Sequence, residues 1–278
     1  MRTSALLLSA VLLGALACDQ HRAEAHAGAR DRDAPLASPS TLDLAERFAP
    51  YEAACFVVLD LESGRVRRWN PEQAATPLSP CSTFKIPNAL IGLETGALAG
   101  TDQVLPWDGT THERVALNRD HDLRSAMDAS VVWYFQEVAR RVGTQRMAGF
   151  LASVGYGNQD ISGGLTQFWL ESSLKISADE QVAFLARMLR GELPVSDQTV
   201  QGVTDILEQR REGDVVLFGK TGSGHQSLGW FVGWLTRPGG TSVFACNVES
   251  TGVYGRDVRA LTEQALEDLA LLPPEPGR

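Results

Sequence analysis

The sequence predicts an α+β fold: a five-stranded antiparallel sheet flanked by terminal helices and completed by both ends of the chain, plus an inserted all-helical lobe. Three observations carry this prediction. Strand-like segments gather near both ends of the folded region, the residues between them show a helical period, and the last strands are joined by short loops that contain glycine.

The predicted strands are rich in β-branched, aromatic and other apolar residues. We expect them at residues 55–61, 65–69, 215–220, 229–235 and 241–248. Residues 62–64, Glu-Ser-Gly, have the composition of a hairpin turn between the first two. Glycines occupy the short connections between the last three, and connections of this length favour antiparallel pairing.

The predicted helices show apolar residues at spacings of three and four. In the middle of the chain we expect them at residues 89–98, 123–142, 144–154 and 178–191, and a further amphipathic helix at 257–271. The motifs described below come from both the strand and the helix regions. We therefore expect them to meet in a cleft between the two lobes.

Length and composition limit the classes of function. The 278 residues, 44% of them hydrophobic, can bury a large core in one domain, or in one domain with two lobes. The formal net charge is −9 and no stripe of Lys or Arg stands out, which argues against nucleic acid or an anionic membrane surface as a partner. The five histidines lack the spacing of metal ligands, so we expect no metal site.

The first residues have the order of a secretory signal peptide: a charged start, an apolar run at 5–17 and then small residues. That run is too short to span a bilayer. We assign 1–27 to the signal, with cleavage after residue 17, 25 or 27, and 28–40 to a flexible leader. A lipid anchor at Cys18 is the alternative. The folded domain is then 41–278, with 41–88 and 200–278 in the α/β lobe and 89–199 in the helical lobe.

Export would place the remaining cysteines in an oxidising compartment. Cys55, Cys81 and Cys246 could then form one disulfide and leave one thiol over. Cys55 and Cys246 both lie in apolar strand-like runs, so buried free thiols are the favoured interpretation.

Ser82 and Lys85 stand three positions apart, where a helical turn places both side chains on one face. A serine hydroxyl is a poor nucleophile at neutral pH and needs a base within hydrogen-bond reach. Lys85 is the nearest candidate, provided that its pocket lowers its pKa, which is about 10.4 in water. The apolar residues that suit such a pocket are Phe84, Val132, Trp169 and Leu170. Pro87 predicts a strained or tightened start of the helix.

Lys220, Thr221 and Gly222 follow a strand-like run. Glycine after Thr221 lets a substrate backbone approach the sheet edge closely, and Lys220 is suited to hold a carboxylate. Thr221 and a distant arginine such as Arg256 are candidates for the anionic group of a substrate.

Two further features complete the candidate site. The backbone N–H groups of Ser82 and Ser223 are suited to form an oxyanion hole. Ser130 is either a member of the site or a helix-capping serine.

Together these motifs resemble those of a class D, oxacillinase-type, serine β-lactamase. The resemblance extends over about residues 56–256 and rests on Ser-Thr-Phe-Lys-Ile-Pro-Asn at 82–88, Ser-Val-Val at 130–132, Tyr-Gly-Asn at 156–158, Phe-Trp-Leu at 168–170 and Lys-Thr-Gly at 220–222. Residues 105–109, 157–164 and 229–234 are also similar to the family. The resemblance implies the fold shared by serine β-lactamases and penicillin-binding transpeptidases.

The resemblance also implies a reaction. Ser82 would be acylated by a β-lactam such as a penicillin and then hydrolysed, and Lys85, carboxylated by carbon dioxide, would be the general base; no other cofactor is expected. Trp169 would hydrogen-bond the carbamate, while Ser130 and Lys220 would pass the proton to the lactam nitrogen. A periplasmic enzyme that confers β-lactam resistance, with a small-molecule substrate as its partner, follows from this comparison.

The same comparison assigns residues to substrate binding. Besides Ser130 and Lys220, these are Thr221, Gly222, Ser223, Arg256, Val132, Phe84 and Leu170, with Tyr156 and Asn158 as wall and loop residues. Arg259 lies close enough to Arg256 to be an alternative carboxylate ligand. The preferred β-lactam and the oligomeric state, monomer or homodimer, stay open.

Other members of the wider group are alternatives. A class A-like enzyme would need Ser-Asp-Asn at the second motif and Glu-x-x-Leu-Asn in a loop; here Val131 and Val132 replace Asp-Asn, and Lys175 replaces the last Asn. Glu171 is therefore interpreted as a solvated loop carboxylate. A β-lactam sensor or a penicillin-binding protein would keep its acyl group, but a sensor needs transmembrane helices before the domain. A silent family member is the last alternative.

Overall fold

The computed structural model describes residues 40, 41 and 43–274, which belong to one compact unit. The predicted signal peptide, Cys18 and all of the predicted leader except Ser40 lie outside the described residues. Within the described part, no helix is long and apolar enough to cross a membrane.

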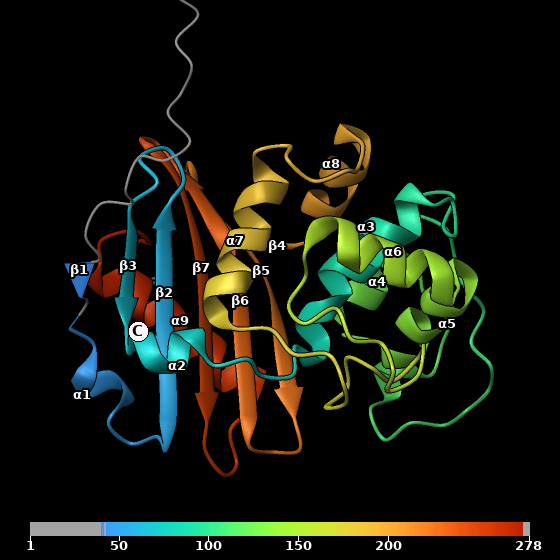
Figure 1. Ribbon diagram of the computed structural model, residues 1–278, viewed down its shortest axis with the longest axis horizontal. Helices are drawn as coiled ribbons and strands as arrows, with labels where there is room; N and C mark the ends of the chain where they lie inside the picture. Colours follow the sequence, from blue (N-terminus) through green and yellow to red (C-terminus); the bar gives the residue numbers. More distant parts are fainter. Residues whose placement is uncertain (1–39, 42, 275–278) are drawn as a thin grey trace, which may run out of the picture. The chain divides into compact units, whose positions relative to one another are not determined.

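A seven-stranded sheet forms the centre of this unit, in the order β1-β3-β2-β7-β6-β5-β4 (Figure 1). The strands are β1 Ser40–Thr41, β2 Ala53–Asp60, β3 Val66–Trp69, β4 Glu208–Glu212, β5 Val215–Gly224, β6 Leu228–Arg237 and β7 Gly240–Glu249. All neighbours pair antiparallel except β1 and β3, which pair parallel. The five predicted strands are confirmed as β2, β3, β5, β6 and β7, but the expected number was too low because two edge strands gave no apolar signal.

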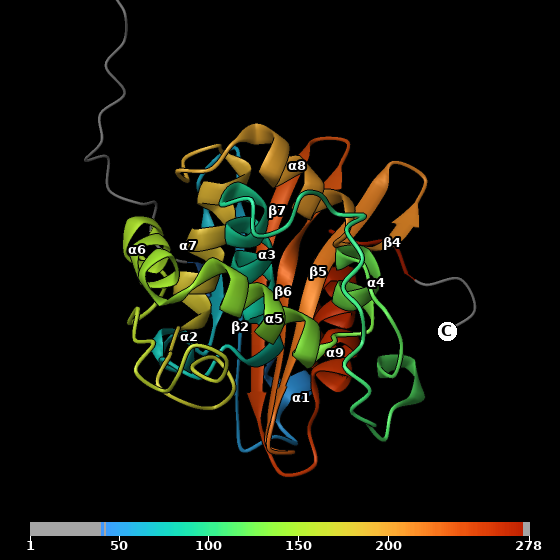
Figure 2. The ribbon, with the colours of Figure 1, turned by 90° about the vertical axis from the view of Figure 1, so that its right-hand side faces the viewer.

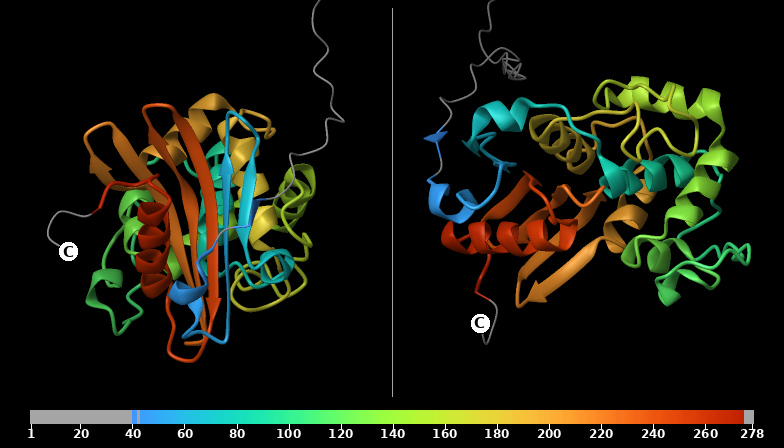
Figure 3. Two further views of the ribbon diagram at one scale, coloured as in Figure 1. Left: turned by 90° about the vertical axis from the view of Figure 1, so that its left-hand side faces the viewer. Right: turned by 90° about the horizontal axis from the view of Figure 1, so that it is seen from below.

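Helices cover both faces of the sheet. On one face lie α1 Ala45–Phe48 and α9 Gly255–Asp268; on the other lie α2 Pro71–Ala75 and α7 Ala178–Leu189 (Figures 1 and 3). Strand β2 shows why the sheet can bury both faces: Cys55 and Val57 join the core on the α7 side, while Phe56 and Val58 join the core on the α9 side. Successive side chains of a strand point to opposite faces.

The same alternation decides the state of two cysteines. Cys55 belongs to the core on the α7 side and Cys246 to the core on the α9 side. Cys55, Cys81 and Cys246 are all buried free thiols. The favoured interpretation is therefore confirmed for Cys55 and Cys246, and the disulfide does not form.

The remaining helices lie to the right of the sheet in Figure 1, on the side that faces the viewer in Figure 2. They are α3 Lys85–Glu94, α4 Leu123–Asp128, α5 Val132–Val142, α6 Thr144–Val154 and α8 Asp197–Asp205, with short 3-10 turns at Cys81–Phe84 and Val115–Leu117. The helix expected at 123–142 is two helices, because Ser130 has a φ of +54° and breaks the regular backbone. α8 was not predicted.

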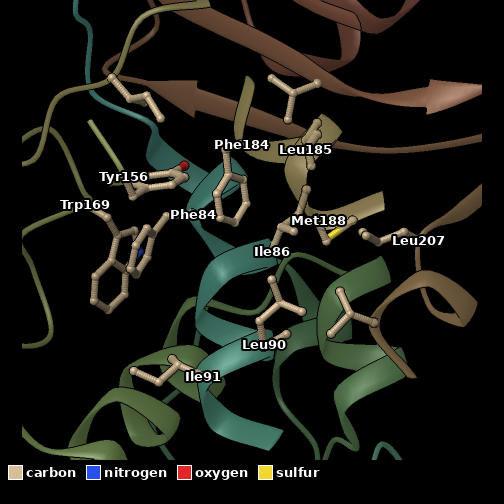
Figure 4. Packing of buried hydrophobic residues seen from close by; sticks show 14 of the residues in the cluster. Phe84, Ile86, Leu90, Ile91, Tyr156, Trp169, Phe184, Leu185, Met188 and Leu207 are labelled. Carbon is tan, nitrogen blue, oxygen red and sulfur yellow. The ribbon is translucent and has the colours of Figure 1, made fainter. Parts of the chain in front are cut away.

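Helix α3 runs through the core that joins the sheet to the helices (Figure 4). Ile86, Leu90 and Ile91 are at most 1% exposed. Phe184 and Met188 of α7 belong to the same core. The first turn of α3 is therefore held from several sides, and this turn carries the residues of the candidate site.

Candidate active site

The nucleophile candidate lies at the junction of a 3-10 turn and a helix. The 3-10 turn Cys81–Phe84 leads directly into α3, and Cys81 has a φ of +49°, which is costly for a residue with a Cβ. Pro87 fits because N–H groups in the first turn of a helix have no intrahelical acceptor. The predicted strained and tightened helix start is confirmed, and it leaves Ser82 half-buried.

Ser82 and Lys85 are in direct contact, as their spacing predicts. Lys85 Nζ donates a hydrogen bond to Ser82 Oγ over 2.7 Å. The Lys85 side chain is buried, and its Nζ lies 5.5 Å from the centre of the Phe135 ring. Burial, followed by the nearby Lys220 charge, holds the pKa of Lys85 well below its ordinary value. The amine is therefore biased toward the neutral form that a base requires.

Aromatic residues form the apolar surroundings of this turn. Phe84 and Trp169 are both buried and stack with ring centres 5.3 Å apart (Figure 4). Phe168 meets both rings edge-on. Leu170 is half-buried beside them. The Trp169 indole N–H is buried and has no hydrogen-bond partner within the described residues. An unpaired buried donor costs free energy, so an acceptor at this position would be strongly favoured.

Ser130 is presented by the break between α4 and α5. Its φ of +54° turns the chain, and its N–H donates to the Met127 carbonyl over 3.2 Å. Neither α4 nor α5 uses Ser130 as its N-cap; these caps are Asp122 and Val131. The capping alternative for Ser130 is therefore wrong, and its hydroxyl is not committed to a helix end.

Strand β5 forms the opposite wall. Lys220 is 5% exposed, and its Nζ donates to the Thr221 carbonyl over 3.2 Å. Burial lowers the pKa of Lys220 to about 8, while the Asp128 carboxylate acts in the opposite direction. A Cβ on Gly222 would lie 3.0 Å from the Pro80 carbonyl oxygen. Glycine at 222 therefore lets β5 approach the nucleophile turn, a constraint that the sequence did not reveal.

A cavity of about 620 Å³ joins these walls. It is lined by Ser82, Arg114, Asp128, Ser130, Val132, Thr221, Ser223, Tyr254 and Arg256. The structure thus brings the predicted motifs together from the nucleophile turn, the α4–α5 break, β5 and the start of α9. Arg114, Asp128 and Tyr254 were missed, because an exposed charged residue or an isolated tyrosine in a loop has no periodic pattern.

The structure distinguishes the two candidate arginines. Arg256 lines the cavity with its guanidinium 4.9 Å from the centre of the Tyr254 ring, and its side chain is 79% exposed. Arg259 is instead bonded to Glu263 over 2.7 Å and to Gln209 over 2.6 Å. Of this pair, Arg256 is the one that lines the cavity, and its side chain stays exposed although its Nε lies 3.5 Å from Asp257 Oδ1.

Tyr156 and Asn158 do not reach the cavity. Tyr156 is buried beside Phe84, and its hydroxyl donates to Gln181 over 3.4 Å. Asn158 is exposed, and its side-chain amide bonds the Ser173 carbonyl and the Lys175 N–H. The structure therefore places both outside the cavity lining, where Tyr156 packs in the core and Asn158 holds a loop.

Glu171 is not a freely solvated carboxylate. Its side chain is 24% exposed and accepts the backbone N–H of His225 over 2.8 Å. The interpretation as a solvated loop residue is therefore wrong, because the turn between β5 and β6 folds onto this carboxylate.

The sequence of this chain is similar to a known family and to several known proteins. The family described as penicillin binding protein transpeptidase domain matches residues 54–267. The probable β-lactamase YbxI of Bacillus subtilis is 42% identical over 73% of this chain and 77% of that protein. β-Lactamase OXA-48 of Klebsiella pneumoniae is 38% identical over 73% of this chain and 78% of that protein.

Solved structures extend the comparison to the fold. The structure of BPu1 β-lactamase has a TM-score of 0.80 and 37% identity, covering 84% of this chain and 99% of that chain. The class D β-lactamase BAT-2 also has a TM-score of 0.80 and 37% identity, covering 84% and 98%. Together with Ser82 at the cavity and the buried Lys85 bonded to it, these matches show that the chain belongs to the class D serine β-lactamases.

Proposed function

We propose that this β-lactam hydrolase opens penicillin-type β-lactams through an acyl-enzyme on Ser82, with Lys85 carbamylated as the general base. The observation that carries the proposal is the buried Lys85 amine, bonded to Ser82 Oγ over 2.7 Å and biased toward its neutral form. Only a neutral amine reacts with carbon dioxide.

The residues around Lys85 fit a carbamate. The unpartnered Trp169 N–H offers a donor for one of its oxygens, and the stacked Phe84 ring excludes water. A carbamate at Lys85 would supply the carboxylate base for proton removal from Ser82 and, later, from the deacylating water. Replacing an ammonium by an anion beside Lys220 would also turn a repulsion into an attraction.

The other cavity residues have roles in acylation. Ser82 Oγ attacks the lactam carbonyl, and the backbone N–H groups of Ser82 and Ser223 stabilise the oxyanion. As the carbon–nitrogen bond breaks, Ser130 and Lys220 deliver a proton to the nitrogen. In deacylation, water adds to the ester carbonyl and Ser82 Oγ leaves with a proton.

Substrate binding uses the β5 side of the cavity. Thr221 and the exposed Arg256 guanidinium line the cavity, and with Lys220 they would hold the carboxylate that β-lactams carry next to the lactam nitrogen. Val132 and Leu170 are the apolar residues proposed to border the bound molecule, with Gly222 keeping β5 close to Ser82.

Turnover and adduct mass together test the proposal. Purified mature protein is mixed with a penicillin and a chromogenic cephalosporin in bicarbonate buffer, and intact mass is recorded during turnover. We expect sustained hydrolysis with little trapped adduct, and neither labelling nor hydrolysis with Ser82→Ala. Ser153→Ala, an exposed serine on α6, is the matched control. A stoichiometric, long-lived adduct would instead identify a sensor or penicillin-binding protein, and labelling of Ser82→Ala would refute Ser82 as the nucleophile.

Export and resistance form the cellular part of the proposal. The signal-like residues 1–27 would direct the chain to the periplasm, where β-lactams meet their targets. Expression in a susceptible bacterium should raise the penicillin concentration that stops growth, and deletion of residues 2–27 should remove this effect. Labelling with a radioactive lipid precursor would decide whether Cys18 is acylated.

A further inference from the structure

A buried hydroxyl ties the Trp169 segment to the nucleophile turn. Ser79 Oγ donates to the Trp169 carbonyl over 3.1 Å and accepts the Glu171 N–H over 2.9 Å. The Ser79 carbonyl in turn accepts the Trp230 indole N–H over 2.9 Å. One side chain therefore fixes the backbone on both sides of Leu170.

The Glu171 carboxylate fastens the same segment to the turn between β5 and β6. Its Oε2 accepts the His225 N–H over 2.8 Å and lies 3.2 Å from His225 Nε2. Glu171, His225 and Gln226 all have positive φ, at 54°, 20° and 60°. Such conformations cost free energy for residues with a Cβ and persist only where contacts hold them. These contacts therefore fix two strained segments against each other.

Gly224 is the residue that makes room for this contact. A Cβ on Gly224 would lie 2.6 Å from Glu171 Oε1. Gly224 is not among the residues with positive φ, so alanine could adopt its backbone conformation. The Gly224→Ala substitution would push the carboxylate away from β5 and leave Glu171 itself unchanged.

We propose that Glu171 and Ser79 are positioning residues that hold the Trp169 indole N–H at the Lys85 pocket and thereby stabilise a carbamate there. The inference rests on the proposed function. Stacking on Phe84 orients the plane of the indole, but no hydrogen bond from the described residues fixes its N–H. The backbone restraints on either side of Leu170 are what set the depth of the indole in the pocket.

The test measures carbamate occupancy separately from activity. Purified wild-type, Glu171→Ala, Glu171→Gln and Gly224→Ala proteins are titrated with ¹³C-bicarbonate, and the carbamate signal is followed by NMR beside penicillin turnover. We expect Glu171→Ala and Gly224→Ala to raise the bicarbonate concentration for half-occupancy about tenfold, the scale seen when residues that orient a reactive group are lost. Glu171→Gln should raise the bicarbonate concentration for half-occupancy less than Glu171→Ala does, because the amide oxygen of glutamine still accepts the His225 N–H.

Two controls make the result specific. Glu192→Ala, at an exposed glutamate just after α7, should leave half-occupancy unchanged. Adding Gly224→Ala to Glu171→Ala should have no further effect, because both act on the same contact. If Glu171→Ala does not fold, Gly224→Ala and Glu171→Gln carry the test.

The outcomes separate the two proposals. A wild-type carbamate whose half-occupancy is the same in Glu171→Ala and Gly224→Ala overturns the positioning role alone. If wild-type protein shows no carbamate at saturating bicarbonate, the proposed base is wrong and the positioning role falls with it.

Discussion

The burial of the Lys220 amine lowers the stability of the folded protein. Burial lowers its pKa from 10.5 to about 8. At 1.36 kcal/mol for each pH unit, this difference corresponds to about 3 kcal/mol of destabilisation at pH 7, where the lysine is protonated in both the folded and the unfolded chain. Methionine has a similar volume and no charge. We expect Lys220→Met to unfold at higher urea concentration than wild type at pH 7.

The stability of the wild-type protein should depend on pH in a defined direction. Between pH 8 and pH 10.5 the unfolded chain binds more protons at Lys220 than the folded chain, so wild-type stability rises with pH in this window. The advantage of Lys220→Met should therefore fall from about 3 kcal/mol at pH 7 to below about 1 kcal/mol at pH 10. Urea unfolding followed by circular dichroism at both pH values measures this difference. Lys175→Met, at a lysine outside the cavity, is the control.

One result would refute this reasoning. If Lys220→Met is less stable than wild type at pH 7, the contacts of the ammonium outweigh the cost of its burial. A Lys220→Met advantage that stays constant from pH 7 to pH 10 would equally show that the titration of this amine is not its source.

Three further predictions concern the cavity. Asp128→Asn removes the carboxylate that raises the pKa of Lys220, so the alkaline limb of the plot of kcat/KM against pH should move to lower pH. Because Asp128 is exposed, we expect a shift of about half a pH unit. A shift to higher pH would contradict this prediction. Trp169→Phe keeps an aromatic ring but loses the unpartnered N–H. The bicarbonate concentration for half-maximal activity should rise about tenfold or more, as expected for a lost hydrogen bond to a charged group. An unchanged dependence on bicarbonate would exclude the proposed role of the indole N–H. Gly222→Ala places a Cβ 3.0 Å from the Pro80 carbonyl oxygen and should lower kcat for every β-lactam alike. Gly149→Ala, where the added Cβ meets no atom within 4 Å, is the control. Full activity of Gly222→Ala would show that the nucleophile turn can move to make room.

The strands were predictable where apolar residues recur. Strand β2, with a continuous buried run from Ala54 to Leu59, and β6 could hardly be missed. Strand β4, Glu208–Glu212, consists of charged and amide side chains and forms only because β5 offers an unpaired edge. Edge strands are often charged, which hides them from any pattern of hydrophobicity.

The catalytic residues of the site were predictable from the sequence, but several residues that line the edge of the cavity were not. Ser82 and Lys85 follow from spacing within one helical turn, and that contact needs no tertiary information. Arg114 and Asp128 reach the cavity only because loops fold over it, and each is an ordinary exposed charge in the sequence. Tyr156, expected as a wall residue, packs edge-on against Phe84 and does not line the cavity, a difference in depth that a motif in the sequence does not show.

The distribution of charge explains how one pocket can favour both a neutral lysine and an anionic substrate. The chain has a formal net charge of −9, yet burial is joined by the nearby charges of Lys220 and Arg114 in lowering the pKa of Lys85. Their repulsion disfavours an ammonium at Lys85. The same positive charges would favour an anion at this position, so the groups proposed to hold a β-lactam carboxylate would also promote carbamylation of the proposed base. A change that weakens this cluster should therefore affect substrate binding and modification together.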